Sequence, residues 1–305
     1  MTSLVSIVMP TYNNASYIKM AIKDIQDQTY EDWELIIVND GSTDNTDEIL
    51  LEYKFCSKIT IINFPSNKGI CYALNAGLDI ARGEYILRFD ADDRCANDRI
   101  EMQLKYLQNN NFDLVGTSVT TINEMGEIIG YSTFSSDDNV LKRIIRFETP
   151  MLHIWLAKKE VYGKIGPYRI GGVEDYDFLL RVLDAGFRIS NDERYYGVFI
   201  RKHSRNTASI HGWNQRRAFN LAWKLHRERV LTGREITSSV ISNGFFSKYG
   251  NQLHSFSNRL LVKAISSNNF VEKTIYSIVS AAISPYQLQY LAFRFIGKLI
   301  KRKII

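Results

Sequence analysis

The chain has 305 residues, of which 45% are hydrophobic and 12% aromatic, a composition that indicates a folded globular protein and excludes a disordered one. Its three cysteines have no Cys-x-x-Cys spacing, which argues against a disulfide framework or a zinc site and favours a reducing compartment. The net charge of +5 is unevenly spread, because residues 201–305 hold 18 basic and 3 acidic side chains, so we expect an anionic partner for that basic third.

The first 115 residues alternate strand-like and helix-like patterns. Short apolar runs predict strands at 5–9, 35–38, 59–63 and 85–89. Helical patterns fall between and after them, at about 15–28, 43–54, 70–81 and 99–108, with Asn13 or Asn14 expected to cap the first helix. This alternation predicts an α/β fold with a mostly parallel sheet and helices on both faces.

The remainder of the chain is less regular. Strands are expected within 115–122 and 128–131, and a helix from about 174 to 185. Beyond about residue 209 the sequence becomes helical and basic, so we expect a catalytic domain at 1–208 and a helical, basic C-terminal region at 209–305. The chain shows no signal peptide and no apolar run of about 18 residues, which favours a cytoplasmic location.

Polar clusters follow each of the first four predicted strands. Taken singly, each could be a turn or a helix cap. The carboxyl ends of parallel strands meet at one edge of a sheet, where ligands bind, so the clusters together predict a binding site. The first turn has neither a Gly-x-Gly-x-x-Gly dinucleotide motif nor a phosphate loop. The clusters are Pro10-Thr11-Tyr12-Asn13, Asn39-Asp40-Gly41-Ser42, Asn67-Lys68-Gly69 and Asp90-Ala91-Asp92-Asp93.

The last cluster holds three carboxylates, Asp90, Asp92 and Asp93, directly after an apolar strand. Like charges this close repel, and a buried carboxylate costs several kcal/mol unless it is paired or bound to a metal. Oxygen ligands favour Mg²⁺ or Mn²⁺, which usually complete their coordination with substrate phosphates. The alternative is an acidic turn in water.

The order and spacing of these motifs over about residues 4–205 resemble family 2 glycosyltransferases with a GT-A fold, including bacterial enzymes of surface polysaccharide and O-antigen synthesis. The motifs that carry the resemblance are 6–13, 37–44, 67–69 with 75–77, and 90–93. The resemblance implies an inverting, metal-dependent enzyme that moves a hexose or N-acetylhexosamine from a UDP-sugar to a glycan acceptor. It also implies a Rossmann-like sheet flanked by helices.

The resemblance further implies roles for single residues on the donor side. The side chains of Pro10, Thr11 and Tyr12 would line the nucleobase pocket. Asp40 would hydrogen-bond the uracil, and Asp92 would ligate Mn²⁺ or Mg²⁺ between the two phosphates. The remaining donor-side residues, near the base, the ribose and the diphosphate, would be Asn67, Lys68, Asp90, Ala91 and Arg201.

On the acceptor side the resemblance makes Asp175 the catalytic base, with Glu174 positioning it or touching the acceptor. The chemistry needs such a base, because the attacking hydroxyl must lose its proton. Taken alone, carboxylates at this predicted helix start could also be caps that the helix dipole stabilises. His153 matches a histidine near the acceptor, although Ile154-Trp155 replaces the usual Pro-Thr, and His203 is a further candidate metal ligand.

The last 20 residues form a basic amphipathic pattern. Such a stripe is typical of a helix lying in a membrane interface, where it would meet anionic lipid and a polyprenyl-diphosphate-linked acceptor. The alternative is an apolar face that packs on the catalytic domain. Nucleic acid is not expected, because no recognition fold is visible. The apolar positions are Leu288, Leu291, Ala292, Phe295, Ile296 and Leu299, with Arg294, Lys298 and Lys301 opposite them.

Other functions fit the sequence less well. A non-catalytic subunit that binds a sugar nucleotide would not need Asp92 and Asp175, and both are present. A nucleotidyltransferase would need a glycine-rich basic loop after the first strand, which residues 10–14 do not supply. A processive synthase would carry membrane-spanning helices and a Gln-x-x-Arg-Trp segment, and neither is visible.

Overall fold

The computed structural model describes residues 3–203, 207–234, 248–267 and 269–304. The chain divides into two compact units, one of residues 1–141 with 150–202 and the other of residues 142–149 with 203–305. The functional boundary that the sequence predicts at residue 208 stays a prediction.

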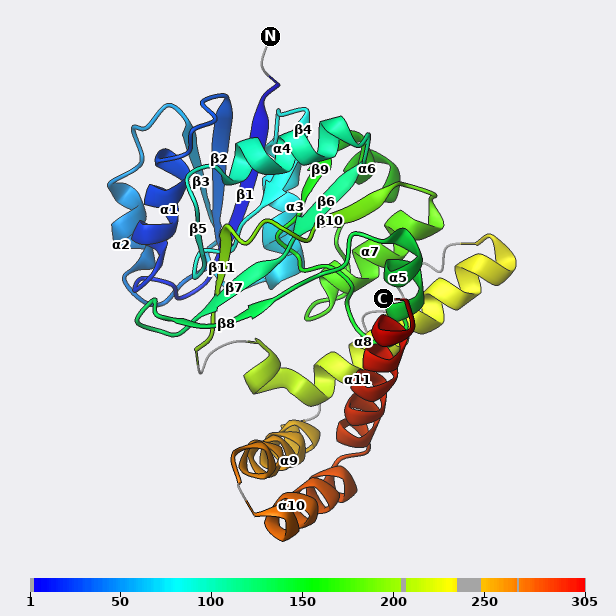
Figure 1. Ribbon diagram of the computed structural model, residues 1–305. Coiled ribbons are helices and arrows are strands. Elements are labelled where there is room, and N and C mark those ends of the chain that lie inside the picture. The colour runs from blue at the N-terminus through cyan, green and yellow to red at the C-terminus, as the bar shows by residue number, and fades with distance from the viewer. Residues whose placement is uncertain (1–2, 204–206, 235–247, 268, 305) are drawn as a thin grey trace. The chain divides into compact units, whose positions relative to one another are not determined.

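The first unit is built on a seven-stranded sheet (Figure 1). Its strand order is β10-β6-β9-β4-β1-β2-β3, and every pair is parallel except those that β9 makes with β4 and β6. The predicted α/β fold is therefore confirmed. The strands are β1 (Val5–Thr11), β2 (Trp33–Asn39), β3 (Ile59–Asn63), β4 (Tyr85–Arg88), β6 (Leu114–Thr117), β9 (Leu156–Lys158) and β10 (Ile189–Asp192).

Helices cover this sheet because its strands are apolar on both sides. Ile7 and Leu35 belong to the core that includes Ile22 of α1 and Leu104 of α4, and burying each such side chain contributes about 1.5–3 kcal/mol. On the other side, α3 approaches so closely that a Cβ on Gly77 would lie 2.6 Å from Val8. The helices of this unit are α1 (Ile18–Gln26), α2 (Thr46–Leu51), α3 (Ile70–Ile80), α4 (Arg99–Asn109), α6 (Lys159–Ile165) and α7 (Glu174–Asp184), together with most of α5 (Asp138–Ile144).

A second, four-stranded sheet has the order β5-β11-β7-β8. The strand predicted over 115–122 is in fact two strands in different sheets, divided at Ser118. The backbone N–H of Ser118 donates to Asp192 and its hydroxyl donates to Glu193, so the ladder is interrupted there. The strands are β5 (Arg94–Cys95), β7 (Val119–Ile122), β8 (Ile128–Ser132) and β11 (Val198–Arg201).

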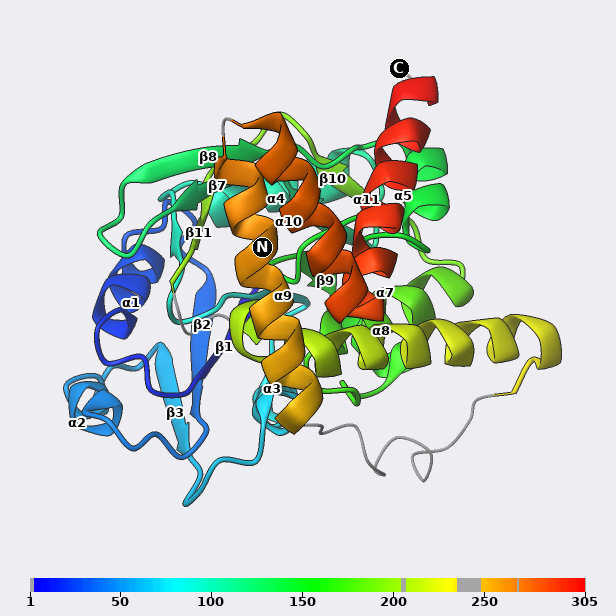
Figure 2. The ribbon, with the colours of Figure 1, turned by 90° about the horizontal axis from the view of Figure 1, so that it is seen from below.

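The second unit is helical, as predicted for the C-terminal region. It contains α8 (Thr207–Thr232), α9 (Lys248–Ser266), α10 (Phe270–Ile283) and α11 (Pro285–Ile304). Figure 2 shows α9 and α10 side by side. Between them the hydroxyl of Ser257 donates to the Ser280 carbonyl at 2.7 Å, and Ser280 donates back to the Ser257 carbonyl at 2.8 Å. These bonds satisfy two polar side chains that are fully buried.

The predicted apolar stripe of α11 is exposed only in part, since Leu291 and Ile296 are half-buried. Leu288, Phe295 and Leu299 are 58%, 63% and 41% exposed. The helix packs through other positions, since Gln287 is buried and Phe293 meets Phe147 edge to face at 5.4 Å. Lys301 lies outside the residues whose side chains are described. Across the described residues, no helix has the length and apolarity needed to span a membrane.

Candidate active site

The loops after β1 and β2 are joined by hydrogen bonds from Asn13. Its backbone adopts φ 56°, and its Oδ1 accepts from the N–H of Thr43 at 2.7 Å. Its own N–H donates to the Ser42 hydroxyl at 2.9 Å. Asn13 therefore ties two loops together and does not cap the first helix, which begins three residues later than predicted, at Ile18, without a side-chain cap.

Asp40 joins the loops after β2 and β3. Its carboxylate is buried and accepts from the N–H groups of Lys68 at 2.7 Å and Gly69 at 2.9 Å. Beside it, Gly41 has φ +66° and lies so near the next loop that a Cβ would be 2.4 Å from the Ser66 carbonyl carbon. The three loops therefore form one continuous wall at the carboxyl edge of the sheet.

The residues predicted to bind the nucleotide lie along this wall with different exposures. Pro10 and Thr11 are buried, while Tyr12 is 44% exposed. Asn67 and Lys68 are exposed, and the Lys68 ammonium lies over the Phe64 ring at 4.6 Å from its centroid. Tyr12 and Lys68 are thus available to a planar ligand, and Asp40 shapes the loop that presents Lys68.

The Asp-Ala-Asp-Asp segment follows β4, and its three carboxylates differ. Asp90 and Asp92 are half-buried, whereas Asp93 is buried and accepts from the N–H of Arg201 at 2.8 Å. Burial, and then the charges of Asp92 and Asp90, hold the pKa of Asp93 well above its usual range. Asp93 therefore anchors β11, and Asp90 and Asp92 are the two carboxylates that a ligand can approach.

His153 reaches the same edge because β9 is antiparallel. A residue just before an antiparallel strand lies at the carboxyl ends of its parallel neighbours, here β4 and β6. His153 Nε2 lies 2.9 Å from Asp90 Oδ2, and its Nδ1 lies 3.8 Å from Asp175 Oδ2. One imidazole ring therefore stands between the carboxylates after β4 and those that open α7.

Arg88, the last residue of β4, links the same two groups. Its side chain is 4% exposed. Its Nε donates to Asp90 Oδ1 at 3.2 Å, and its Nη2 donates to Glu174 Oε1 at 3.1 Å. Arg88 directly precedes the acidic segment but was not predicted as a site residue. The apolar pattern of a strand does not indicate which groups the side chain of its last residue contacts.

The pKa values in this cluster depend on burial and on neighbouring charges. Burial raises the pKa of Asp90, but Arg88 and His153 outweigh it and hold that pKa well below its usual range. Burial acts to lower the pKa of His153, and Asp90 reverses this, so the net shift is upward. Burial raises the pKa of Glu174 in spite of Arg88. The cluster is thus a set of interacting charges with little water around it.

The two candidates on or after β11 have different surroundings. The guanidinium of Arg201 is buried. Its Nε donates to the Asp92 carbonyl at 2.8 Å, and its Nη1 donates to the carbonyls of Asn123 at 3.0 Å and Glu124 at 2.9 Å. Arg201 thereby supports the backbone of the acidic segment. His203 is the last described residue before 204–206 and is half-buried.

The donor set at this edge suits a magnesium or manganese ion. Asp92 offers a half-buried carboxylate beside that of Asp90, and hard oxygen atoms are the ligands that these ions prefer. Among the described residues, no group of three or more His, Cys, Asp or Glu is placed to hold a metal by itself. Mg²⁺ sites commonly use one or two carboxylates with substrate phosphates, and this donor set fits that pattern.

The loop that leads to α7 is held at several points. Asn75 of α3 donates to the Tyr168 carbonyl and accepts from the Tyr168 N–H, both at 2.9 Å. Asp177 is buried and pairs with Arg169 at 2.8 Å and Arg181 at 3.0 Å. These contacts hold the start of α7, with Asp177 buried between two arginines.

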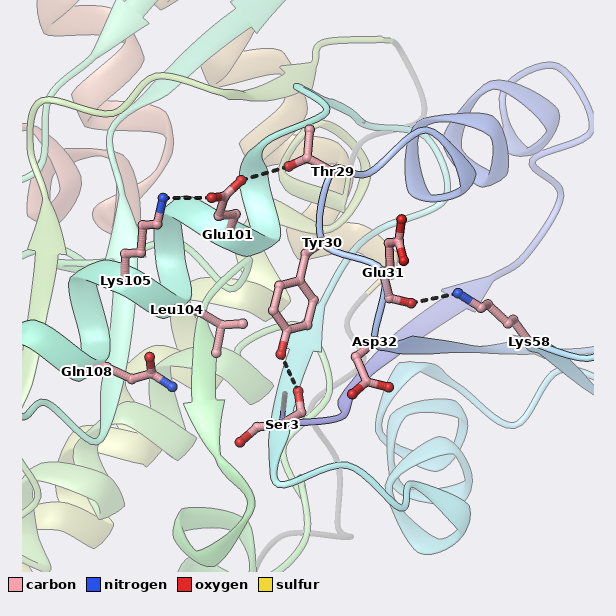
Figure 3. A pocket seen from close by; sticks show the side chains of 10 residues that line it. All are labelled: Ser3, Thr29, Tyr30, Glu31, Asp32, Lys58, Glu101, Leu104, Lys105 and Gln108. Carbon is pink, nitrogen blue, oxygen red and sulfur yellow. Dashed lines mark hydrogen bonds and ion pairs between the residues drawn. The ribbon is translucent and has the colours of Figure 1, made fainter. Parts of the chain in front are cut away.

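A cavity of about 830 Å³ opens at the opposite edge of the sheet. It lies beside the residues that precede β1, β2 and β3, including Ser3, Asp32 and Lys58 (Figure 3). Several polar groups there bind one another, such as the Tyr30 hydroxyl and the Ser3 carbonyl at 2.6 Å. The cavity is therefore separate from the acidic cluster at the carboxyl ends.

Comparison with known proteins identifies the family. The model of glycosyl transferase family 2 matches residues 6–168. The chain belongs to this family. TuaG of Bacillus subtilis, a putative teichuronic acid biosynthesis glycosyltransferase, is 28% identical to it over 74% of this chain and 88% of its own length. An uncharacterized glycosyltransferase of Rickettsia bellii is 36% identical over 147 residues. The match covers 47% of this chain and only 21% of that relative.

Solved structures support the same fold for this glycosyltransferase. TarS of S. aureus, residues 1–349 in complex with UDP, superposes with a TM-score of 0.58 and 17% sequence identity. The match covers 95% of this chain and 91% of that one. The likeness confirms the predicted GT-A fold.

Proposed function

We propose that this glycosyltransferase moves a hexose or N-acetylhexosamine from a UDP-sugar to a glycan acceptor, with inversion at the anomeric carbon. The observation that supports this proposal is that two clusters of carboxylates lie close together at one edge of the sheet. His153 lies 2.9 Å from Asp90 and 3.8 Å from Asp175, so the acidic segment after β4 and the start of α7 share one site.

The donor would lie along the wall formed by the three loops. Pro10, Thr11 and Tyr12 would border the base, with Asp40, Asn67 and Lys68 beside it. Asp90 and Ala91 would face the ribose. Asp92, with His203 as a further candidate, would hold Mn²⁺ or Mg²⁺, which would stabilise the charge of the departing diphosphate. Arg201 acts here through the backbone of Asp92 and not through a direct contact.

Asp175 is the proposed base. It would accept the proton of the acceptor hydroxyl while that oxygen forms its bond to the anomeric carbon and the bond from that carbon to the diphosphate breaks. The electron pair of the broken bond leaves with UDP. A single displacement of this kind inverts the anomeric centre, so an α-linked donor gives a β-linked product. Glu174 and His153 would position the base and the acceptor.

The names of related proteins support a UDP donor and a surface polysaccharide product. TarS was solved with UDP and with UDP-GlcNAc, and TuaG is named for teichuronic acid biosynthesis. We therefore place the reaction in assembly of a surface polysaccharide, such as an O-antigen or capsule repeat.

The exposed stripe on α11 supports a membrane-linked acceptor. Leu288, Phe295 and Leu299 face water on a chain segment with a strong excess of basic residues. Such a surface fits the anionic cytoplasmic leaflet, where a polyprenyl-diphosphate-linked glycan would be presented. The enzyme would then be a cytoplasmic protein that associates peripherally with the membrane.

Calorimetric titration tests the donor and the metal together. UDP is titrated into the purified full chain with Mn²⁺ and then with EDTA, followed by a turnover screen over UDP-sugars. We expect binding that EDTA abolishes, and release of UDP with one of the donors. Binding that persists in EDTA would refute the metal role of Asp92, and no binding in either buffer would refute the UDP assignment.

A further inference from the structure

Arg88 contacts a carboxylate from each half of the candidate site. Its Nε lies 3.2 Å from Asp90, in the donor-side acidic segment. Its Nη2 lies 3.1 Å from Glu174, which precedes the proposed base by one residue. A guanidinium is planar and always charged, so one Arg88 conformation fixes the relative positions of both carboxylates.

The contact with Glu174 also sets the start of α7. While Oε1 of Glu174 accepts from Arg88, its Oε2 accepts from the N–H of Gly172 at 3.1 Å. Gly172 has φ +83°, a backbone conformation that glycine tolerates. The Glu174 side chain, which Arg88 binds, therefore holds the turn that leads into α7. Asp175 is the residue that follows Glu174.

The arrangement is not one that folding alone would favour. Arg88 is buried, and its Nη1 has no hydrogen-bond partner among the described residues. Buried ion pairs often add little stability compared with apolar residues of the same volume, and an unpartnered buried donor is unfavourable. A buried charge at this position is better explained by a role in the reaction.

We propose that Arg88 is a positioning residue that couples the donor carboxylate Asp90 to the base helix through Glu174. This role rests on the transferase chemistry proposed above. It predicts that Arg88 affects transfer more than it affects nucleotide binding.

The first test is a double-mutant cycle on the full chain. Arg88→Lys keeps the charge but loses the two-pronged geometry. We expect it to lower kcat by roughly 100-fold, the cost of a misplaced catalytic group, with a smaller change in the Kd for UDP with Mn²⁺. The double variant Arg88→Lys/Glu174→Gln should be about as impaired as the worse single variant.

A control changes an arginine that also binds a buried glutamate but is itself exposed. Arg82 donates to the buried Glu34 at 2.6 Å, near the amino end of β2. Arg82→Lys should leave kcat near that of the wild type. If Arg88→Lys also keeps the wild-type kcat, or if the Arg88 and Glu174 effects multiply independently, the coupling is refuted. A wild-type chain that binds no UDP would instead refute the proposed function.

The second test needs no substrate. Hydrogen exchange over residues 172–177 is compared in the wild type, Arg88→Lys and Arg82→Lys, all without ligand. Faster exchange confined to that segment in Arg88→Lys supports the link to α7, because the N–H of Gly172 donates to Glu174. Unchanged exchange there would refute the link, whether or not the donor has been identified.

Discussion

At the scale of single residues, the site combines carboxylates with two cationic groups of different kinds. Arg88 is charged at every accessible pH. The charge of His153 depends on pH, and its pKa is raised because Asp90 outweighs the effect of burial. Both lie within 3.2 Å of Asp90. The site therefore carries a fixed charge on its buried side and a charge that depends on pH beside Asp175.

Replacing the proposed base tests the mechanism directly. Asp175→Asn keeps the size of the side chain but cannot accept the proton, so kcat should fall by about 10²–10⁴-fold. The Kd for UDP, measured by calorimetry, should stay near the wild-type value. Asp184→Asn, exposed in the last turn of the same helix, serves as the control. Substantial turnover by Asp175→Asn would remove this residue from the mechanism.

The raised pKa of His153 predicts a pH-dependent stability. A folded-state pKa above the unfolded value of about 6.5 means that the folded protein binds the proton more tightly. The contribution is therefore fully present below about pH 6.5 and is lost as pH rises through the folded pKa. The Tm difference between wild type and His153→Gln, measured by calorimetry from pH 5 to 9, should shrink with rising pH. A difference that grows with pH contradicts this assignment.

At the scale of elements, the sequence was sufficient to predict helices and strands whose hydrophobic pattern extends over several residues. The four βα repeats were predicted because strands such as β2 contain an uninterrupted apolar run, here residues 35–38, and the helices carry one-sided stripes. Their carboxyl ends carry the predicted clusters around Asp40 and Asp90. The parallel order then placed those clusters at one edge, as the structure shows.

Short or interrupted elements were not predictable. β9 has only three residues, Leu156–Lys158, too few for any periodicity. Its antiparallel direction, which brings His153 to Asp90, therefore left no signal in the sequence. The break at Ser118 was missed because residues on both sides of it favour strands, and only contacts with residues 192 and 193 separate β6 from β7.

The close approach of two loops at Gly41 gives a prediction at this scale. Gly41→Ala adds a Cβ 2.4 Å from the Ser66 carbonyl carbon and forces a positive φ on alanine. The loop that presents Lys68 must then shift, so both the Tm and the affinity for UDP should fall. Calorimetry measures both quantities.

Gly126→Ala is the control that introduces backbone strain without a steric clash. Gly126 also has a positive φ, +89°, but an added Cβ would meet nothing within 4 Å. This variant should lose roughly 1 kcal/mol of stability from backbone strain and keep its affinity for UDP. Equal loss of UDP affinity in the two variants would contradict the proposed nucleotide wall.

At the scale of the whole molecule, the C-terminal third combines an excess of basic side chains, 18 against 3 acidic ones in residues 201–305, with many exposed apolar side chains. Two interpretations of the α11 stripe were possible from the sequence, because a pattern of apolar positions does not say what covers them. In the structure, Leu288, Phe295 and Leu299 are exposed while Gln287 is buried. Leu291 and Ile296 of the same stripe are half-buried, and contact of α11 with a membrane stays a proposal.

Removing this stripe should weaken binding to membranes. The triple variant Leu288→Ser/Phe295→Ser/Leu299→Ser loses apolar area worth about 1.5–3 kcal/mol per side chain when fully buried. Co-sedimentation with anionic vesicles should therefore fall at least about tenfold. The control is Val230→Ser/Leu231→Ser, at exposed apolar residues of α8. Equal co-sedimentation of the triple variant and the wild type would rule out α11 as the membrane contact.

The bond between Arg88 and Glu174 spans 86 positions of the chain, and this separation has a consequence for synthesis on the ribosome. A growing chain that has emerged through β4 exposes Arg88 before its partner exists, so the completed site forms late and in one step. The loops after β1, β2 and β3 can thus form early, whereas the proposed base, Asp175, joins them only after α7 has been made.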